Sequence, residues 1–375
     1  MRVLQVIDSL RIGGAQKLTL TFMDEARKQG VDVTIVSLSE FKNGMALAKP
    51  LEEKGAKVLL FSGEKLFSLN RLREFTRFVR EGNFSVIHTH LTYANIIGGI
   101  AGRLTGTPVV TSLHSTAVGQ HANFLRDTIE NIMLRTTTRL IGVGQKVADV
   151  YKDMLNRDVV VLPNAVAENI ALSADERAAL RTQIVLDTEQ PTLVTVGRLS
   201  VDKGVDDLLD AFAQVCQTVP NAALLIVGDG ILREELEARS QTLSLDENVF
   251  WLGMRDDVPN LLSISNIYIS ASRREGLPLS VLEAMMAALP MVVTAVGDVP
   301  KLVGDDAGLL VAHSQPNELA QAALNVLAMP EYGKALGNAG LARVRAEYGA
   351  EQWFMRLMKI YTEITPVARE QAHVQ

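Results

Sequence analysis

The chain has 375 residues, of which 47% are hydrophobic and 21% charged, a length and composition that suit two soluble globular domains. Its aromatic content of 5% and its dispersed Lys and Arg residues argue against a nucleic-acid-binding protein. The single cysteine, Cys216, excludes an internal disulfide, and no apolar run reaches the ~18 residues that a membrane span needs. Because the start, MRVLQVIDSL, predicts a strand rather than a signal peptide, we expect a cytoplasmic protein.

The net charge of −6 is divided unevenly along the chain. Residues 1–165 hold 21 Lys and Arg against 15 Asp and Glu, whereas residues 166–375 hold 16 against 28. This asymmetry fits two ordinary solvated surfaces. It also fits a first half that meets an anionic partner, such as the inner face of the plasma membrane, as a peripheral contact. Both interpretations remain open at this point.

The first half alternates short apolar runs with amphipathic stretches. Such alternation predicts parallel strands covered by helices on both faces. The expected strands are Val3–Ile7, Val33–Leu38, Lys57–Phe61, Val86–His88, Val109–Leu113, Leu140–Val143 and Val159–Leu162. The expected helices include Ala15–Lys28, Leu69–Val79 and Tyr93–Leu104.

A second series follows a polar, alanine-rich stretch at residues 166–190, which we interpret as a helical crossing between domains. Its expected strands are Leu193–Val196, Leu224–Val227, Val249–Leu252, Ile267–Ser270, Met291–Thr294 and Leu309–Val311. Its expected helices include Val205–Gln217, Leu232–Leu243, Ser280–Ala288 and Glu318–Leu327, and the tail from Gly333 to Thr365 reads as almost wholly helical. The sequence therefore predicts an α/β protein with two Rossmann-like, doubly wound domains, residues 1–166 and 167–350. We expect ligands at the carboxyl ends of the strands, in the cleft between the domains.

Glycines and cations follow several of these strands. Gly13 and Gly14 come after the first one and open a helix, which suits either a tight turn or an anion site at a helix N-terminus. The spacing is not G-x-G-x-x-G, so a dinucleotide fingerprint is absent. In the second series, Arg198 and Lys203 lie beside Gly197 and Gly204, with no acidic neighbour in the sequence except Asp202. Two cations at a crevice suit a diphosphate.

The next strands of the second series also end in candidate ligand contacts. Gly228 and Gly230 form a glycine turn in VGDG, and backbone groups at Gly253, Met254 and Arg255 could hold a flat base.

Two glutamates flank the turn after the fourth strand of the second series. Glu275 lies in a polar loop, Gly276 and Pro278 turn the chain, and Ser280 is expected to cap a helix that carries Glu283 on its first turn. This arrangement points two carboxylates and free helix N–H groups at one crevice.

Metal ligands are not evident in the sequence. His88 and His90 alternate at a strand end, but no third ligand is nearby in the sequence, so two polar side chains that close a strand are the preferred interpretation. No Asp-x-Asp metal clamp stands in a fitting loop. We therefore expect no metal ion and no cofactor.

The order GGAQ, TSLHS, GRLSVDKG, VGDG, WLG and EGLPLSVLEAMMAALP resembles the retaining GT-B glycosyltransferases of family four. The resemblance implies an enzyme that transfers a sugar from a nucleoside diphosphate, UDP before GDP, to a glycan, lipid-linked or small-molecule acceptor. Retention of configuration and a bacterial envelope or exopolysaccharide pathway are part of that expectation. The last helix, about residues 351–366, is expected to pack back on the first domain.

The resemblance also implies roles for individual residues. Glu283 would bind the ribose hydroxyls, Glu275 a hydroxyl of the donor sugar, and the Gly276 and Leu277 amides the sugar or β-phosphate. Arg198 and Lys203 would neutralise the leaving diphosphate. His114 would lie near the sugar's 6-hydroxyl, and Gly13 and Gly14 would lie under the diphosphate.

Four residues depart from the family pattern: Gln16 stands where an acid is frequent, Ala165 replaces a glycine after Asn164, Lys301 replaces a glutamate, and Ala288 occupies the position of a common glycine. The alternatives are a catalytically silent GT-B partner subunit and a nucleotide-sugar epimerase of the same architecture. A phosphorylase fits the glutamate context poorly.

Overall fold

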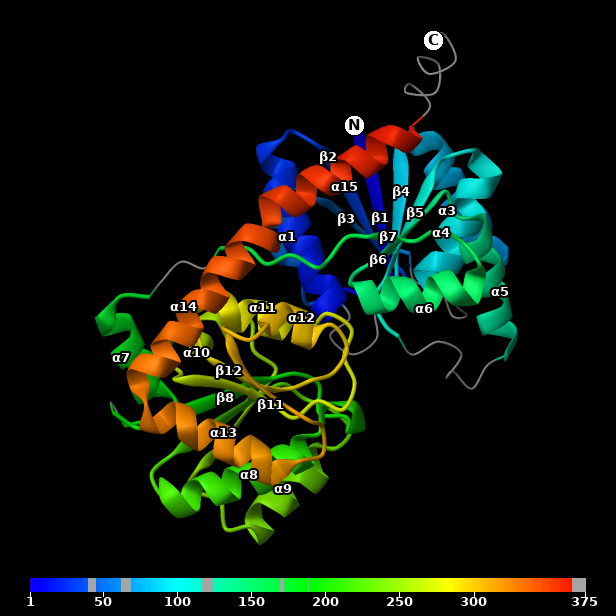
Figure 1. The fold of residues 1–375 in the computed structure, drawn as a ribbon. Helices are drawn as coiled ribbons and strands as arrows, with labels where there is room; N and C mark the ends of the chain where they lie inside the picture. Colours follow the sequence, from blue (N-terminus) through cyan, green and yellow to red (C-terminus); the bar gives the residue numbers. More distant parts are fainter. Residues whose placement is uncertain (40–44, 62–68, 117–123, 169–171, 188, 366–375) are drawn as a thin grey trace. The chain divides into compact units, whose positions relative to one another are not determined.

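The computed structural model describes residues 1–39, 45–61, 69–116, 124–168, 172–187 and 189–365 (Figure 1). The chain divides into two compact units, each described here by itself. Unit 1 comprises Met1–Ala165 and Ala350–Gln375, and unit 2 comprises Val166–Gly349. No helix in the described part of the chain is long and apolar enough to cross a membrane.

Unit 1 is built on one parallel sheet of the strand order β3-β2-β1-β4-β5-β6-β7. The order reverses direction between β1 and β4, so the sheet has its switch point there. In chain order its elements are β1 (Arg2–Ile7), α1 (Gly14–Lys28), β2 (Asp32–Ser37), α2 (Ala48–Glu53), β3 (Lys57–Leu60), α3 (Leu69–Gly82), β4 (Val86–His90), α4 (Thr92–Thr105), β5 (Val109–Leu113), α5 (Phe124–Thr136), β6 (Arg139–Gly142), α6 (Gln145–Leu155), β7 (Val160–Val161) and α15 (Ala350–Ile364).

The central strands of unit 1, β1, β2, β4 and β5, are buried on both faces. In β1, Val3 and Ile7 join a core formed with α1, α2 and α15, whereas Leu4 and Val6 join a core formed with α3 and α4. Successive strand residues point to opposite faces, so a strand between two helical layers must be apolar throughout. This constraint explains why continuous apolar runs identified the strands.

The C-terminal helix α15 belongs to unit 1. Its apolar face is buried against α1, where the rings of Phe354 and Phe22 lie 5.1 Å apart and Leu357 is fully buried. The tail is not one continuous helix, because α14 (Pro330–Glu347) ends before Tyr348 and Gly349, and α15 starts at Ala350.

Unit 2 has a six-stranded parallel sheet of the order β10-β9-β8-β11-β12-β13, with its switch point between β8 and β11. Its elements are α7 (Ala174–Gln183), β8 (Thr192–Val196), the 3₁₀ turn η1 (Val201–Lys203), α8 (Val205–Thr218), β9 (Ala223–Val227), α9 (Arg233–Thr242), β10 (Val249–Gly253), α10 (Val258–Ser263), β11 (Ile267–Ser270), α11 (Leu279–Met286), β12 (Met291–Thr294), α12 (Val299–Val303), β13 (Gly308–Val311), α13 (Pro316–Ala328) and α14. The fold class predicted from the sequence, two doubly wound α/β domains, is confirmed.

The stretch interpreted as a crossing between domains is part of unit 2. Helix α7 begins with a capping box formed by Ser173 and Glu176, and Leu180, Ile184 and Leu186 are buried in the core of this unit. The prediction of a crossing was wrong because a short polar helix with few buried residues looks like a linker in sequence.

Ala288 adopts a left-handed backbone conformation with φ of 56°. This position follows α11, and a residue with a Cβ pays a steric penalty there that glycine does not. The departure from the family's glycine is therefore a local source of strain.

Leu357→Ala is expected to destabilise unit 1 by about 2–5 kcal/mol, because it leaves a cavity in the core beneath α15. The chain has two tryptophans, Trp353 in unit 1 and Trp251 in unit 2. Urea unfolding followed by fluorescence in a Trp251→Phe background therefore reports on unit 1.

Met355→Ala, on the same helix but 60% exposed, is the matched control and should leave the midpoint unchanged. Equal midpoints for the two variants would contradict the docking of α15.

Candidate functional site

The loops that follow β8 and β11 meet at the switch point of unit 2. Lys203, at the end of η1, and Glu275, after β11, form an ion pair with Nζ and Oε1 2.5 Å apart. Their side chains are only 24% and 12% exposed. The expectation that Lys203 has no acidic neighbour except Asp202 was wrong, because strand order β8-β11 places a residue 72 positions away beside it.

Two residues that the sequence analysis missed hold this pair in place. The Ser272 hydroxyl donates to Glu275 Oε1 at 2.8 Å, so that oxygen accepts from both Ser272 and Lys203. The Arg273 guanidinium bonds Asp206 and Asp207, each at 2.7 Å, and its backbone N–H donates to the Asp202 carbonyl at 2.8 Å. The loops after β8 and β11 are thereby cross-linked. In the sequence, the position of Ser272 three residues before Glu275 was the signal that could have indicated their hydrogen bond.

The two arginines of the predicted donor site differ in their surroundings. Arg198 is exposed directly after β8, and among the residues that the structure describes its guanidinium has no ion-pair or hydrogen-bond partner. Arg255 is instead held by Asp257 through two bonds of 2.7 Å. Met254 beside it is 50% exposed. Arg198, unlike Arg255, is thus available to an anion.

The glycines of this edge allow the loops to approach one another. A Cβ on Gly228, whose φ is +139°, would lie 1.8 Å from the Gly197 carbonyl oxygen, and one on Gly230 would lie 2.2 Å from that of Leu199. Gly253 accepts a backbone hydrogen bond from Gly228 at 2.8 Å. Close packing between backbone segments therefore explains why residues 228 and 230 are glycines, without a contact to any ligand. A Cβ on Gly197, by contrast, would come no closer than 3.5 Å to the Lys203 side chain, which is an ordinary contact distance.

Helix α11 begins one residue earlier than its expected cap. Pro278 is the N-cap residue, without a side-chain cap bond, and Ser280 lies inside the helix, where its Oγ accepts from the Tyr268 hydroxyl at 2.9 Å. Glu283, half-buried, is consequently on the second turn and not the first. The capping prediction was wrong because burial of the adjacent apolar residues sets the start of this helix.

The turn between Glu275 and α11 is fixed by its backbone. Gly276 accepts from the Asp298 N–H at 3.0 Å, and Leu277 is buried. Gly297 packs so closely on the Glu275 carbonyl that a Cβ there would lie 2.3 Å from its oxygen. The structure thus brings Arg198, Lys203, Glu275, Gly276 and the start of α11 to one edge of one sheet.

The remaining predicted site residues lie in unit 1. Gly14 opens α1 without a side-chain cap, and Gly13 is extended, with its hypothetical Cβ 2.6 Å from Gln16 Oε1. Gln16 is buried, so this departure from the family pattern forms part of the turn itself.

His114, which is partly buried, lies beside two buried histidines, His88 and His90. His90 Nδ1 lies 3.1 Å from His114 Nε2, and the rings of His88 and His90 are 4.2 Å apart. His88 bonds the Tyr361 hydroxyl at 2.6 Å and the Ser112 hydroxyl at 2.8 Å. His114 is thus a third histidine beside His88 and His90 in space, which the spacing in sequence did not indicate. Nonetheless, the described residues contain no group of His, Cys, Asp or Glu suited to a metal.

Burial keeps these histidines neutral. Desolvation lowers the pKa of His114 to about 4 and that of His88 to about 3, in the second case aided by His114. Desolvation also lowers the pKa of His90, next to the other two rings. His114 can therefore take part in hydrogen bonds at neutral pH but does not carry positive charge.

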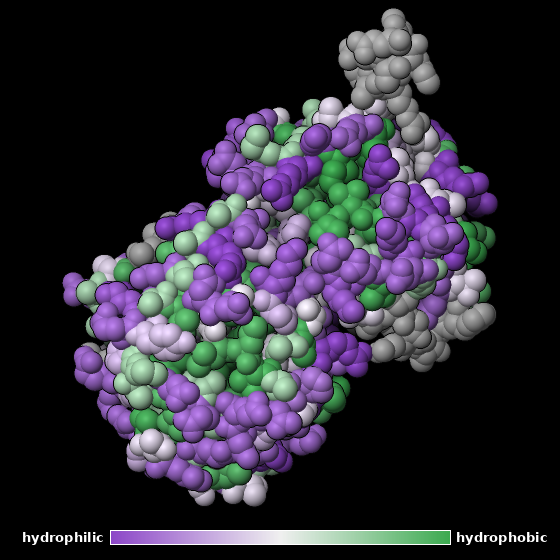
Figure 2. All heavy atoms as spheres, viewed as in Figure 1, coloured by the Kyte–Doolittle hydropathy of each residue, from purple (hydrophilic) through white to green (hydrophobic). Residues whose placement is uncertain are grey.

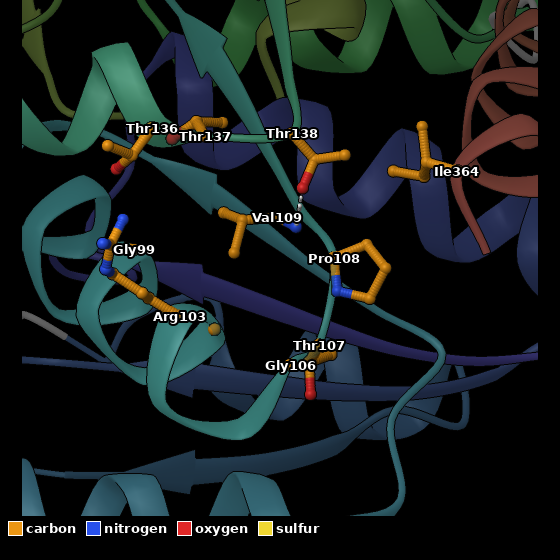
Figure 3. Close-up of a pocket in the computed structure, with 11 residues that line it drawn as sticks. Gly99, Arg103, Gly106, Thr107, Pro108, Val109, Thr136, Thr137, Thr138 and Ile364 are labelled. Atoms are coloured by element: carbon orange, nitrogen blue, oxygen red, sulfur yellow. Dashed lines mark hydrogen bonds between the residues drawn. The ribbon is translucent and has the colours of Figure 1, made fainter. Parts of the chain in front are cut away.

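A cavity of about 430 Å³ lies at the opposite, amino-end edge of the unit 1 sheet (Figure 3). Arg103, Pro108, Thr138 and Ile364 are among its lining residues, and the Thr138 hydroxyl already accepts from the Val109 N–H at 3.1 Å. A smaller pocket in unit 2 is lined by Gly197, Arg198, Lys203 and Ser272, among others. We place the candidate site at the smaller pocket, since the charged and conformationally constrained groups converge there.

Comparison with known proteins identifies the family. Residues 12–169 match the model described as Glycosyltransferase Family 4, and residues 176–343 match that of Glycosyl transferases group 1. In Anabaena, Alr3699/HepE, crystallised with UDP and glucose, has the same fold with a TM-score of 0.87 at 20% identity, covering 97% of this chain and 100% of that one. The chain belongs to the group 1 glycosyltransferases and has the GT-B fold, as the resemblance indicated.

Two curated relatives are similar over part of their length. The Escherichia coli UDP-Gal:alpha-D-GlcNAc-diphosphoundecaprenol alpha-1,3-galactosyltransferase is 29% identical over 58% of this chain, and the D-inositol 3-phosphate glycosyltransferase of Segniliparus rotundus is 27% identical over 69%. The matched stretches span 59% and 62% of those two proteins.

The histidine group predicts a pH dependence of stability. The unfolded chain protonates His114 near its ordinary pKa of 6.5, whereas the folded chain does so only near 4. The contribution of neutral His114 to the free energy of unfolding is thus fully present above about pH 7.5. It is lost as the pH falls through 6.5 towards 4, by at most about 1.4 kcal/mol per pH unit.

Asp8 opposes this trend, because burial raises its pKa to about 7 and the folded state binds that proton more tightly. The readout is therefore the difference in unfolding free energy between the parent and His114→Gln, measured in urea from pH 8 to 5. The unfolding free energy of the parent should fall steadily relative to that of His114→Gln as the pH is lowered. A difference in unfolding free energy that stays constant with pH would contradict the neutral state of His114.

Proposed function

We propose that the protein is a retaining glycosyltransferase that moves a sugar from a nucleoside diphosphate to an acceptor hydroxyl. The observation that carries the proposal is the convergence of Arg198, Lys203, Glu275 and the start of α11 at the switch point of unit 2, in a chain of this family. Ligands of doubly wound sheets bind at such points.

Arg198 and Lys203 neutralise the leaving diphosphate in this proposal. As the bond between the anomeric carbon and the diphosphate oxygen breaks, negative charge grows on the diphosphate, and preorganised cations stabilise that charge. Lys203 must then exchange its Glu275 partner for phosphate oxygens, which frees the Glu275 carboxylate for a hydroxyl of the sugar. Glu283 binds the ribose hydroxyls, and the amides of Gly276 and Leu277 bind the sugar or the β-phosphate.

The acceptor oxygen bonds to the anomeric carbon on the face from which the diphosphate departs, and its proton passes to a phosphate oxygen. Cations of the protein take the place that a resident metal holds in other transferases. His114, Gly13 and Gly14 contribute from unit 1, His114 as a neutral hydrogen-bonding group. These three assignments rest on the family resemblance.

The donor base is proposed as uridine first and guanosine second. Among the relatives, the Escherichia coli enzyme is named for UDP-Gal and a mannosyltransferase of Corynebacterium glutamicum for GDP-mannose. Their names include a lipid-diphosphate and a phosphatidylinositol acceptor. A lipid-linked or other glycan acceptor, within bacterial envelope or exopolysaccharide synthesis, follows by analogy.

Arg198→Ala should weaken UDP binding by at least about tenfold, because it removes charge-assisted hydrogen bonds worth about 1.5–3 kcal/mol. Transfer should be lost while the melting temperature stays unchanged, since Arg198 is exposed. Calorimetric titration with UDP, GDP and ADP measures this and identifies the base.

Lys334→Ala, an exposed cation on α14, is the control and should bind UDP like the parent. Unaltered UDP affinity in Arg198→Ala would overturn the site assignment, and UDP binding without any transfer would favour a silent partner subunit.

We further propose that unit 1 touches an anionic membrane surface with its α3–α5 layer. Helices α3, α4 and α5 pack side by side, and Leu104 and Ile132 are 59% and 50% exposed near the exposed Arg103 and Arg135. Apolar side chains among arginines suit the interface of an anionic bilayer. Figure 2 shows hydrophilic residues over much of the visible surface of each unit, with hydrophobic patches among them.

Co-sedimentation with phosphatidylglycerol vesicles tests this contact. The double variant Leu104→Ser, Ile132→Ser should pellet at least about threefold less than the parent. Val185→Ser, at an 80% exposed position in unit 2, should pellet like the parent. Equal sedimentation of all three proteins would contradict the proposal.

A further inference from the structure

The cavity of about 430 Å³ in unit 1 lies at the amino-end edge of the sheet, away from the carboxyl edge that carries the predicted site residues (Figure 3). Its walls are the end of α4, the loop that leads into β5, and the loop between α5 and β6, and Ile364 of α15 also lines it. Small-molecule sites have volumes of about 300–1,000 Å³, so the cavity is large enough for a ligand. The proposed donor site does not use it.

Arg103, in the last turn of α4, lines this cavity with an unpaired charge. Its guanidinium has no hydrogen-bond or ion-pair partner in the part of the chain that the structure describes. In Figure 3 its side chain extends in the direction of Thr136, at the end of α5. Residues 99–110 and 131–143, which supply most of the walls, contain three arginines and no Asp or Glu. Positive charge therefore borders the cavity.

An arginine in the last turn of a helix can serve only to offset the negative end of the helix dipole. At this edge, however, other groups already bond carbonyls at the helix ends. The Thr105 hydroxyl donates to the Ala101 carbonyl at 2.9 Å at the end of α4. At the end of α5, Arg157 donates to two carbonyls, at 2.7 and 2.9 Å. Arg103 bonds none of these carbonyls, so its guanidinium is available to an anionic ligand.

Two threonine hydroxyls of the walls have complementary hydrogen-bonding capacity. Thr138 Oγ1 accepts from the Val109 N–H at 3.1 Å, and its own hydrogen has no acceptor among the described residues. Thr138 can therefore donate to a ligand. Thr136 Oγ1 donates to the Met133 carbonyl at 3.0 Å, so its lone pairs can accept from one. This pattern fits a ligand that carries an anionic oxygen next to a hydroxyl group.

Exposed apolar side chains border the same cavity. Leu104 directly follows Arg103, and Ile132 lies one helical turn before Thr136 on α5, and both are exposed. Among the lining residues, Ile364 adds a further apolar side chain. A ligand with a polar, anionic head and apolar chains matches these surroundings better than a wholly polar metabolite does.

We propose that the cavity binds the headgroup of an anionic phospholipid that carries hydroxyl groups, phosphatidylglycerol. The phosphate binds the Arg103 guanidinium and accepts from the Thr138 hydroxyl, and a glycerol hydroxyl donates to Thr136. The acyl chains lie against Leu104 and Ile132. The inference rests on the proposed membrane contact of unit 1, and it adds the class of lipid and the site that recognises it.

The charges on α15 do not cancel this preference for an anion. Glu363 is next to the lining residue Ile364, but its side chain is exposed, and Lys359 lies one helical turn earlier on the same helix. Opposite charges at this spacing on a helix are neighbours and offset each other. The arginines of the walls therefore determine the sign of the charge at the cavity.

Selectivity among phospholipids follows from the same groups. A phosphatidylcholine headgroup brings a second cation towards Arg103 and has no hydroxyl to donate to Thr136. A site that hydrogen-bonds a hydroxyl discriminates against an analogue that lacks it. The cavity should therefore prefer phosphatidylglycerol to phosphatidylcholine.

Saturation-transfer NMR titrations of the full chain with dihexanoyl-phosphatidylglycerol, kept below its micelle concentration, test the site. The parent should bind this lipid at least about fivefold more tightly than dihexanoyl-phosphatidylcholine. Arg103→Gln should weaken its binding at least about tenfold, because charge-assisted hydrogen bonds to the phosphate are lost. Thr138→Val should weaken it too, with its melting temperature reported alongside because the Val109 N–H loses its acceptor.

Arg77→Gln, at an exposed position on α3, is the matched charge control and should bind the lipid like the parent. Undetectable binding of the phosphatidylglycerol, equal affinity for the two lipids, or equal affinity of Arg103→Gln and the parent would each overturn the inference. Equally tight binding of glycerophosphoglycerol, the headgroup without acyl chains, would overturn the lipid assignment in favour of a free polyol phosphate.

Co-sedimentation of the parent and Arg103→Gln with phosphatidylglycerol vesicles separates this inference from the proposed membrane contact. A parent that does not pellet would refute the membrane contact itself. A parent that pellets, together with unaltered affinity of Arg103→Gln for the monomeric lipid, would refute only the site in the cavity. UDP affinity should be the same in both proteins, because Arg103 lies at the opposite edge of the unit 1 sheet from the predicted site residues of that unit.

Discussion

The ion pair between Lys203 and Glu275 is the interaction on which the arrangement of unit 2 depends. Both side chains are largely withdrawn from water, and a buried charge is costly unless it is paired. Lys203 comes from the loop after β8 and Glu275 from the loop after β11, so the pair spans the switch point of the sheet. A diphosphate is also negatively charged. It could therefore replace Glu275 as the partner of Lys203 when a donor binds.

Backbone packing makes this pair possible. Gly204, directly after Lys203, has a φ of +58° and lies so close to the Ala271 carbonyl oxygen that a Cβ would be 2.2 Å from it. Gly228 and Gly230, which follow the next strand, β9, pack equally closely against the backbone of the loop after β8. Because the loops are in backbone contact, the side chains above them have little freedom. Preorganisation of this kind is what electrostatic stabilisation of a leaving group requires.

The two sheets have the same doubly wound topology but carry different side chains at their switch points. Unit 2, from the acidic part of the chain, exposes Arg198 beside Lys203, whereas unit 1, from the basic part, gathers Asp8, Glu130 and neutral histidines. The net charge of a domain therefore says little about the charge of its site. The arginines of unit 1 that are exposed, such as Arg103 and Arg135, lie on its helical layer instead.

The sequence predicts much of the fold because parallel strands must be apolar on both faces. Val109–Leu113, Ile267–Ser270 and Met291–Thr294 have the expected bounds, and the other strands differ by one or two residues. The family, and the residues at the carboxyl edge of the unit 2 sheet, could be predicted from the motifs that follow the strands. What escaped prediction depends on strand order: β8 beside β11 pairs Lys203 with Glu275, and β4 beside β5 brings His114 to His90. Residues far apart in sequence become neighbours only through that order, and spacing alone does not report it.

The exchange of Glu275 for diphosphate at Lys203 is tested most directly by titrating UDP into Glu275→Gln and into the parent at low salt. The account predicts that Glu275→Gln binds free UDP more tightly than the parent, because Lys203 has lost its competing carboxylate, while sugar transfer is abolished. Glu237→Gln, which breaks the ion pair with Arg233 on α9, should leave UDP affinity unchanged. Weaker UDP binding by Glu275→Gln than by the parent would contradict the account.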